Sequence, residues 1–164
     1  MCVILRFVSG GDWDSHVIRW YTDSEWSHVE AVYGDRTFGA MLKGGVKWRN
    51  FDDPEYRNVK RMAYKHLSCT PDQERRFWYF QKEQEGKPYD WQGIFRFSPV
   101  LRLLVSERDW RDPRSWFCSD DQLAALECAG ITKVPHGDAL RSTSPAILYA
   151  MVEQLKMVEF SKLL

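Results

Sequence analysis

Two short segments, far apart in the chain, carry residue types that could perform nucleophilic catalysis. Residues 26–30 read WSHVE and predict a strand that carries His28, and residues 116–123 read WFCSDDQL and predict a helix that begins at Cys118. A helix N-terminus stabilises a thiolate through its dipole and its backbone N–H groups. An imidazole that faces the thiol can take its proton and later return it to the leaving group. The pattern therefore predicts a cysteine nucleophile of lowered pKa with a histidine base.

Glu30 is a candidate third member of this site. It lies two residues after His28 and therefore on the same face of the predicted strand, about 7 Å along it. A carboxylate in that position would orient the imidazole and favour its charged form. Simpler interpretations stay open at this point: Glu30 as a solvent-facing strand residue, His28 as a structural histidine and Cys118 as a small core residue. The remaining histidines, at positions 16, 66 and 136, are expected on the surface.

Composition narrows the class of protein. The chain has 164 residues, 44% of them apolar, which fits a single domain over residues 1–164 with a full core. Basic and acidic residues balance at 23 each, so there is no electrostatic argument for binding nucleic acid or an anionic membrane. No apolar run approaches the roughly 20 residues of a membrane span, and no signal peptide is recognisable at the start. We expect a soluble, cytoplasmic protein whose oligomeric state the sequence does not indicate.

The four cysteines, at positions 2, 69, 118 and 128, form no CxxC pair. A structural zinc site is therefore not expected, and the proposed chemistry requires neither a metal nor an organic cofactor. The three cysteines other than Cys118 are expected to be free thiols, mostly buried as small hydrophobic residues.

Hydrophobic periodicity predicts an α+β fold in which an antiparallel sheet of five to six strands packs on helices. The first half of the chain has the alternation of a meander, with strands expected at 3–7, 28–33, 37–42, 46–51 and 58–64 and a short helix at 14–21. Thr70, Pro71 and Gln73 form a capping box that starts a helix ending near residue 84. Further helices are expected at 118–129 and 145–156, and residues 98–115 are expected to form a surface loop.

A third segment, residues 86–93 with the sequence GKPYDWQG, completes a resemblance to a known family. Cell-wall endopeptidases of the NlpC type (the NlpC/P-sixty superfamily, papain-like) carry a G-x-P-Y-x-W-G-G segment and then F-D-C-S-G-L at the start of the catalytic helix. Here the histidine segment precedes the cysteine helix by about 90 residues. That order resembles the circularly permuted branch, which includes lecithin retinol acyltransferase-like proteins and bacterial and phage proteins with S-H-V-E and W-F-C-S-E segments.

The resemblance implies a permuted papain-like arrangement and a thiol hydrolase that works by acyl transfer. Cys118 matches the nucleophile, His28 the base, and Tyr89 the tyrosine that lines the site near the oxyanion position. The implied substrate is an amide in a peptide, with peptidoglycan stem peptides first and lipid or thioester acyl groups second. The phage members of the branch imply virion association as an alternative location.

The chain departs from the family pattern at one position. The third polar residue of the family usually lies about 12 residues after the histidine, where this sequence has Ala40. Three interpretations are open: Glu30 takes the place of that residue, a main-chain carbonyl does so, or the triad is incomplete. An incomplete triad would favour a different class of function, a non-catalytic module that holds a peptide or a partner protein in the same cleft.

Overall fold

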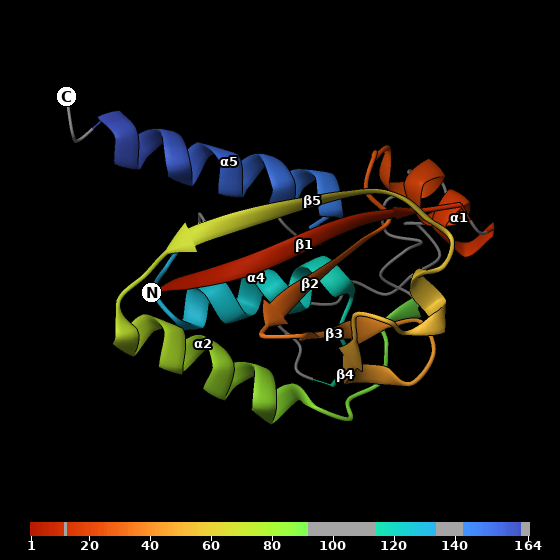
Figure 1. Ribbon diagram of the computed structural model, residues 1–164, viewed down its shortest axis with the longest axis horizontal. Helices are drawn as coiled ribbons and strands as arrows, with labels where there is room; N and C mark the ends of the chain where they lie inside the picture. Colours follow the sequence, from red (N-terminus) through yellow and green to blue (C-terminus); the bar gives the residue numbers. More distant parts are fainter. Residues whose placement is uncertain (12, 92–113, 134–142, 162–164) are drawn as a thin grey trace.

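The computed structural model describes residues 1–11, 13–91, 114–133 and 143–161. Most of the loop expected at 98–115, together with His136, lies outside these residues. The described chain forms a five-stranded antiparallel sheet in the order β4-β3-β2-β1-β5 (Figure 1). The strands are β1 (Cys2–Gly10), β2 (His28–Tyr33), β3 (Arg36–Met41), β4 (Gly45–Asn50) and β5 (Val59–Ser68).

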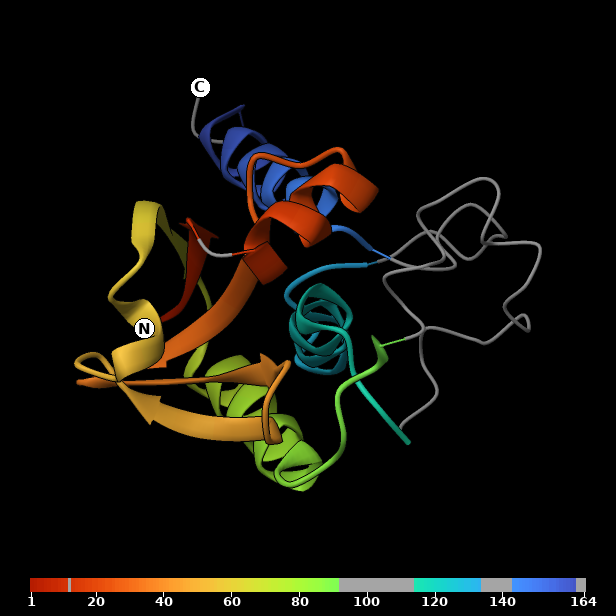
Figure 2. The same cartoon turned by 90° about the vertical axis from the view of Figure 1, so that its right-hand side faces the viewer.

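Helices cover one face of this sheet. Figure 2 shows α4 (Cys118–Cys128) between α5 (Pro145–Ser161) and α2 (Pro71–Gln84), all on the same side of the strands. A shorter helix, α1 (Trp13–Thr22), joins β1 to β2, and a 3₁₀ turn, η1 (Pro54–Tyr56), joins β4 to β5. The α2 helix begins with the expected capping box at Thr70.

Alternation along the strands separates a hydrophobic face from a polar one. Leu5 pairs with Ala31 and Phe7 with Val29, and all four are fully buried against the helices. The intervening residues point to the opposite face, so the two predicted site residues His28 and Glu30 lie on the side of the sheet away from the helical layer. Their partners on β1 are Val8 and Arg6, respectively.

A glycine allows residues 86–88 to lie against the edge of the sheet. Gly45 has φ +69°, and a Cβ added there would lie 2.1 Å from the Lys87 carbonyl oxygen. Hydrogen bonds from Val46 N–H to Lys87 O (2.9 Å) and from Gly86 N–H to Val46 O (2.8 Å) fix this contact. A residue with a side chain at position 45 would be strained and would collide with the backbone. The segment before Tyr89 is therefore anchored to β4.

The α+β class and the positions of the main elements predicted from the sequence are confirmed. The prediction about the remaining cysteines was wrong in part: they are free, but Cys2 and Cys128 are exposed and Cys69 is half-buried. Each lies at or just beyond the end of a strand or helix, where the hydrophobic layer ends. In the part of the chain that the structure describes, no helix is long and apolar enough to cross a membrane.

Candidate active site

The start of α4 lies where two strands separate. Pairing between β2 and β3 stops at Ala31 and Phe38. Beyond that point the Gln122 side chain donates to the Phe38 carbonyl (3.2 Å), and the Val29 backbone N–H donates toward the Cys118 sulfur. The gap between the strands thus allows a cysteine from the helical layer to reach the peptide that follows His28.

The Cys118 thiol is fully buried, and burial raises its pKa to about 12. The nearby Asp120 carboxylate raises it further, whereas the Val29 N–H and contacts with Ser119 lower it. The sequence-based expectation of a lowered pKa was therefore wrong for this state of the protein. A helix start stabilises a thiolate, but here the loss of hydration outweighs that effect.

His28 is an uncharged base in this geometry. Burial lowers its pKa, the Glu30 carboxylate opposes that shift, and Arg49 and Arg6 lower the pKa further. Its Nε2 atom lies 3.6 Å from Glu30 Oε2 and has no hydrogen-bond partner among the described residues. In this state the imidazole of His28 and the thiol of Cys118 are both uncharged, so they do not form an ion pair.

Glu30 is fully buried, so the interpretation of a solvent-facing strand residue is wrong. Its Oε1 atom accepts from Arg6 Nε (2.8 Å) and Nη2 (2.5 Å). Its Oε2 atom accepts from Arg49 Nη2 (2.8 Å) and the Tyr56 hydroxyl (2.7 Å). Burial opposes ionisation of Glu30, but the Arg49 and Arg6 guanidinium groups hold its pKa well below the usual range. The carboxylate is therefore ionised and fixed beside the imidazole.

Three residues of this cluster were not identified from the sequence. The Arg6 and Arg49 guanidinium groups both lie 4.1 Å from the centre of the Tyr56 ring, which they hold as cation–π partners. A signal existed for Arg6, because it is a charge within the apolar strand 3–7 and so requires a buried partner. No local pattern marks Tyr56, which reaches the site from a turn.

Tyr89 is brought beside Cys118 by a short parallel bridge. Trp116 N–H donates to the Pro88 carbonyl (3.0 Å), and Asp90 N–H donates to the Trp116 carbonyl (2.9 Å). The Tyr89 side chain, 7% exposed, interacts with the Cys118 side chain. Burial first, and Cys118 next, raise the Tyr89 pKa well above its ordinary value, so the phenol keeps its proton. The two segments that resemble family motifs are thus neighbours in space.

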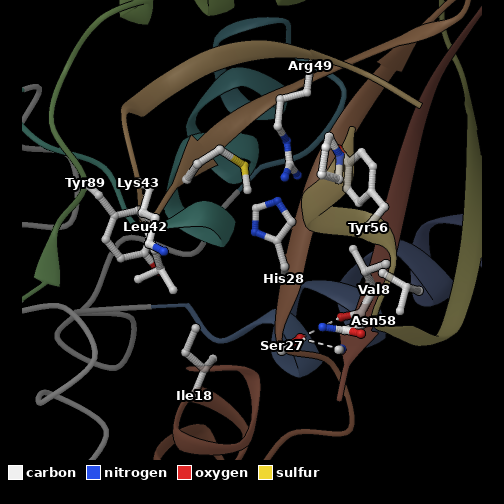
Figure 3. A pocket seen from close by; sticks show the side chains of 14 residues that line it. Val8, Ile18, Ser27, His28, Leu42, Lys43, Arg49, Tyr56, Asn58 and Tyr89 are labelled. Carbon is white, nitrogen blue, oxygen red and sulfur yellow. Dashed lines mark hydrogen bonds between the residues drawn. The ribbon is translucent and has the colours of Figure 1, made fainter. Parts of the chain in front are cut away.

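A pocket of about 200 Å³ opens in front of these residues. Figure 3 shows His28 within it, with Arg49 and Tyr56 beside the imidazole and Tyr89 across the pocket. Ala40, where the family has its third polar residue, is fully buried in the core on β3 and pairs with Val46.

No family model and no curated protein matches the sequence. Among solved structures, the chain is similar to the metalloprotein YiiX from Escherichia coli O157:H7, which is described as DUF1105. The TM-score is 0.60 and the sequence identity 16%, over 94% of this chain and 81% of that one. At this identity the similarity shows a shared fold.

The description of YiiX as a metalloprotein raises the question of a metal here. The described residues contain no group of three or more histidine, cysteine or acidic side chains placed to hold a metal ion. The one carboxylate beside His28 is already bound by two arginines. The residues of this site therefore do not fit a metal centre.

Proposed function

We propose that the protein is a cysteine-dependent hydrolase of the permuted NlpC type, in which Cys118 attacks a carbonyl and forms a thioester. The observation that carries the proposal is the interaction of the Cys118 side chain with the Tyr89 side chain and with the backbone N–H of Val29, the residue that follows His28 on β2. His28 in turn lies 3.6 Å from the buried Glu30 carboxylate. The resemblance of residues 86–93 and 116–123 to family segments supports it.

The geometry supports an assignment of roles to the two ring nitrogens of His28. Its Nε2 atom faces Glu30 at 3.6 Å, so Nδ1 is the atom that would accept the thiol proton. Because the thiol pKa is about 12 and the imidazole is neutral, proton transfer accompanies the attack on a bound substrate. The resulting imidazolium lies beside the Glu30 carboxylate, which stabilises its positive charge. Glu30 acts here as a positioning residue.

The negative charge that forms on the substrate oxygen must be stabilised by hydrogen-bond donors. The first N–H groups of a helix have no partner within the helix, and Cys118 occupies that first position of α4. The Tyr89 hydroxyl, kept protonated by its raised pKa, supplies a second donor. His28 then protonates the leaving amine, and water attacks the thioester with His28 again as the base. The acid product leaves and the thiol regains its proton.

Peptide amides, with peptidoglycan stem peptides first, are the proposed substrate class. The test is incubation of the protein with purified peptidoglycan and with a synthetic stem peptide, followed by mass spectrometry of the fragments. Cys118→Ser should abolish cleavage. Cys128→Ser is the matched control, because it changes the exposed cysteine at the other end of the same helix. Equal cleavage by wild type and Cys118→Ser would overturn the proposal, and cleavage of thioester or lipid acyl substrates alone would reassign the substrate.

A second candidate is a binding module that has lost its chemistry. It is favoured by the full burial of the Cys118 sulfur and by the apolar residue at position 40. This alternative predicts saturable binding of a stem peptide with no covalent adduct and no fragments, and binding that is unchanged in Cys118→Ser.

A further inference from the structure

The described side chains that line the pocket at His28 include cationic groups but no acidic ones. Two of its described lining residues, Lys43 and Arg49, are cationic, and none of them is acidic. The Glu30 carboxylate beside His28 is fully buried and accepts hydrogen bonds from two arginines and a tyrosine. A negatively charged ligand would therefore meet two positive side chains without repulsion from a described lining residue.

Arg49 is held in place before any ligand arrives. Its side chain is 3% exposed, its Nη2 atom donates to Glu30 Oε2 at 2.8 Å, and its guanidinium stacks over the Tyr56 ring at 4.1 Å. Figure 3 shows it directed at the pocket next to His28. A fixed guanidinium loses little conformational entropy on binding and matches the planar shape of a carboxylate.

Lys43 is the second cationic side chain of the pocket lining and, unlike Arg49, it is exposed. It is exposed in the turn between β3 and β4, and it forms no ion pair with the described acidic residues. A lysine at the mouth of a pocket can close on a charged ligand with its flexible side chain.

The remaining walls indicate the size and polarity of the ligand. Val8, Ile18 and Leu42 contribute apolar surface, and about 200 Å³ is less than the roughly 300–1,000 Å³ of sites for drug-sized ligands. The space suits a single small residue that has an apolar part and a charged group.

We propose that this pocket binds a free carboxylate on a small residue of the substrate, close to the bond that Cys118 attacks. This inference rests on the proposed hydrolase function and adds a specificity to it: Arg49 and Lys43 select substrates with an anionic residue beside the scissile amide. Neutral peptides of the same shape are poor ligands.

Binding is measured by NMR titration in the Cys118→Ala variant, so that the result does not depend on catalysis. The probes are N-acetylalanine, its neutral amide and inorganic phosphate. We expect saturable binding of the carboxylate with shifts at His28 and Lys43, and at least about tenfold weaker binding of the amide. Lys43→Gln should weaken carboxylate binding roughly two- to fivefold, and Lys43→Arg should restore it.

Lys82→Gln is the matched control, because it removes the same charge from the exposed surface of α2. Equal binding of acid and amide, tighter binding of phosphate, or an equal effect of the two lysine variants would overturn the inference. None of these results bears on cleavage by the wild-type protein, so failure of the pocket and failure of the hydrolase proposal are distinguished.

Discussion

Asp121 is a buried carboxyl group in the first turn of α4, and it provides a quantitative test of the structure. It is fully buried, and burial raises its pKa from 3.8 to about 8. Its Oδ2 atom accepts from Gln122 (3.0 Å). Its Oδ1 atom and Gln81 Oε1 are both buried acceptors without a donor among the described residues. At neutral pH the folded protein therefore holds Asp121 protonated and uncharged.

The sign of the pH dependence follows from the raised pKa. The stabilising proton is fully present below the unfolded pKa near 3.8 and is lost as the pH rises through about 8. Between these values the folded protein binds a proton that the unfolded chain has released. Stability therefore falls with rising pH, by up to about 1.4 kcal/mol for each pH unit. By pH 7 this amounts to about 4 kcal/mol at most.

Asp121→Asn should remove this dependence, because the amide carries N–H donors at every pH. We expect the variant to be more stable than wild type by roughly 2–4 kcal/mol at pH 7 and about equally stable near pH 4. Urea denaturation followed by tryptophan fluorescence at pH 4 to 8 measures both differences. Asp52→Asn, the same change at an exposed position after β4, is the control and should stay within about 0.5 kcal/mol at each pH. A variant with the same pH slope as wild type, or one less stable at pH 7, would show that Asp121 is not held neutral in the folded protein.

Three further changes test other parts of the structure. Gly45→Ala should destabilise the fold by about 2 kcal/mol or more in thermal denaturation, because φ is +69° and the new Cβ would meet the Lys87 carbonyl; an unchanged melting temperature would contradict the contact. Iodoacetamide at pH 6 should modify exposed Cys128 before buried Cys118, as read by peptide mass spectrometry, and the reverse order would show that the thiol is accessible and ionised. Tyr89→Phe should reduce turnover roughly ten- to a thousandfold with no change in folding, and full activity would exclude the hydroxyl as an oxyanion donor.

Local sequence patterns predicted most of the fold. Alternation gave the strands around His28, and the capping box at Thr70 gave the start of α2, because these signals depend on residues close together in the chain. The pKa of Cys118 was predicted with the wrong sign, since the depth at which α4 enters the gap between β2 and β3 depends on packing over long sequence separations. The contact between Tyr56 and Glu30 could not be predicted for the same reason. That His28 and Glu30 share a face could be predicted, because it depends only on the two-residue period of a strand.

Nucleophilic attack by Cys118, with His28 as the base, can be measured in a variant with Cys118 as its sole cysteine. The measurement is release of p-nitrophenolate from p-nitrophenyl acetate, with the acetyl group located by mass spectrometry. We expect repeated turnover, a transient acetyl thioester on Cys118, and loss of turnover in His28→Gln. Release no faster than in the matching Cys118→Ser protein, or a single acylation without turnover, would contradict this expectation.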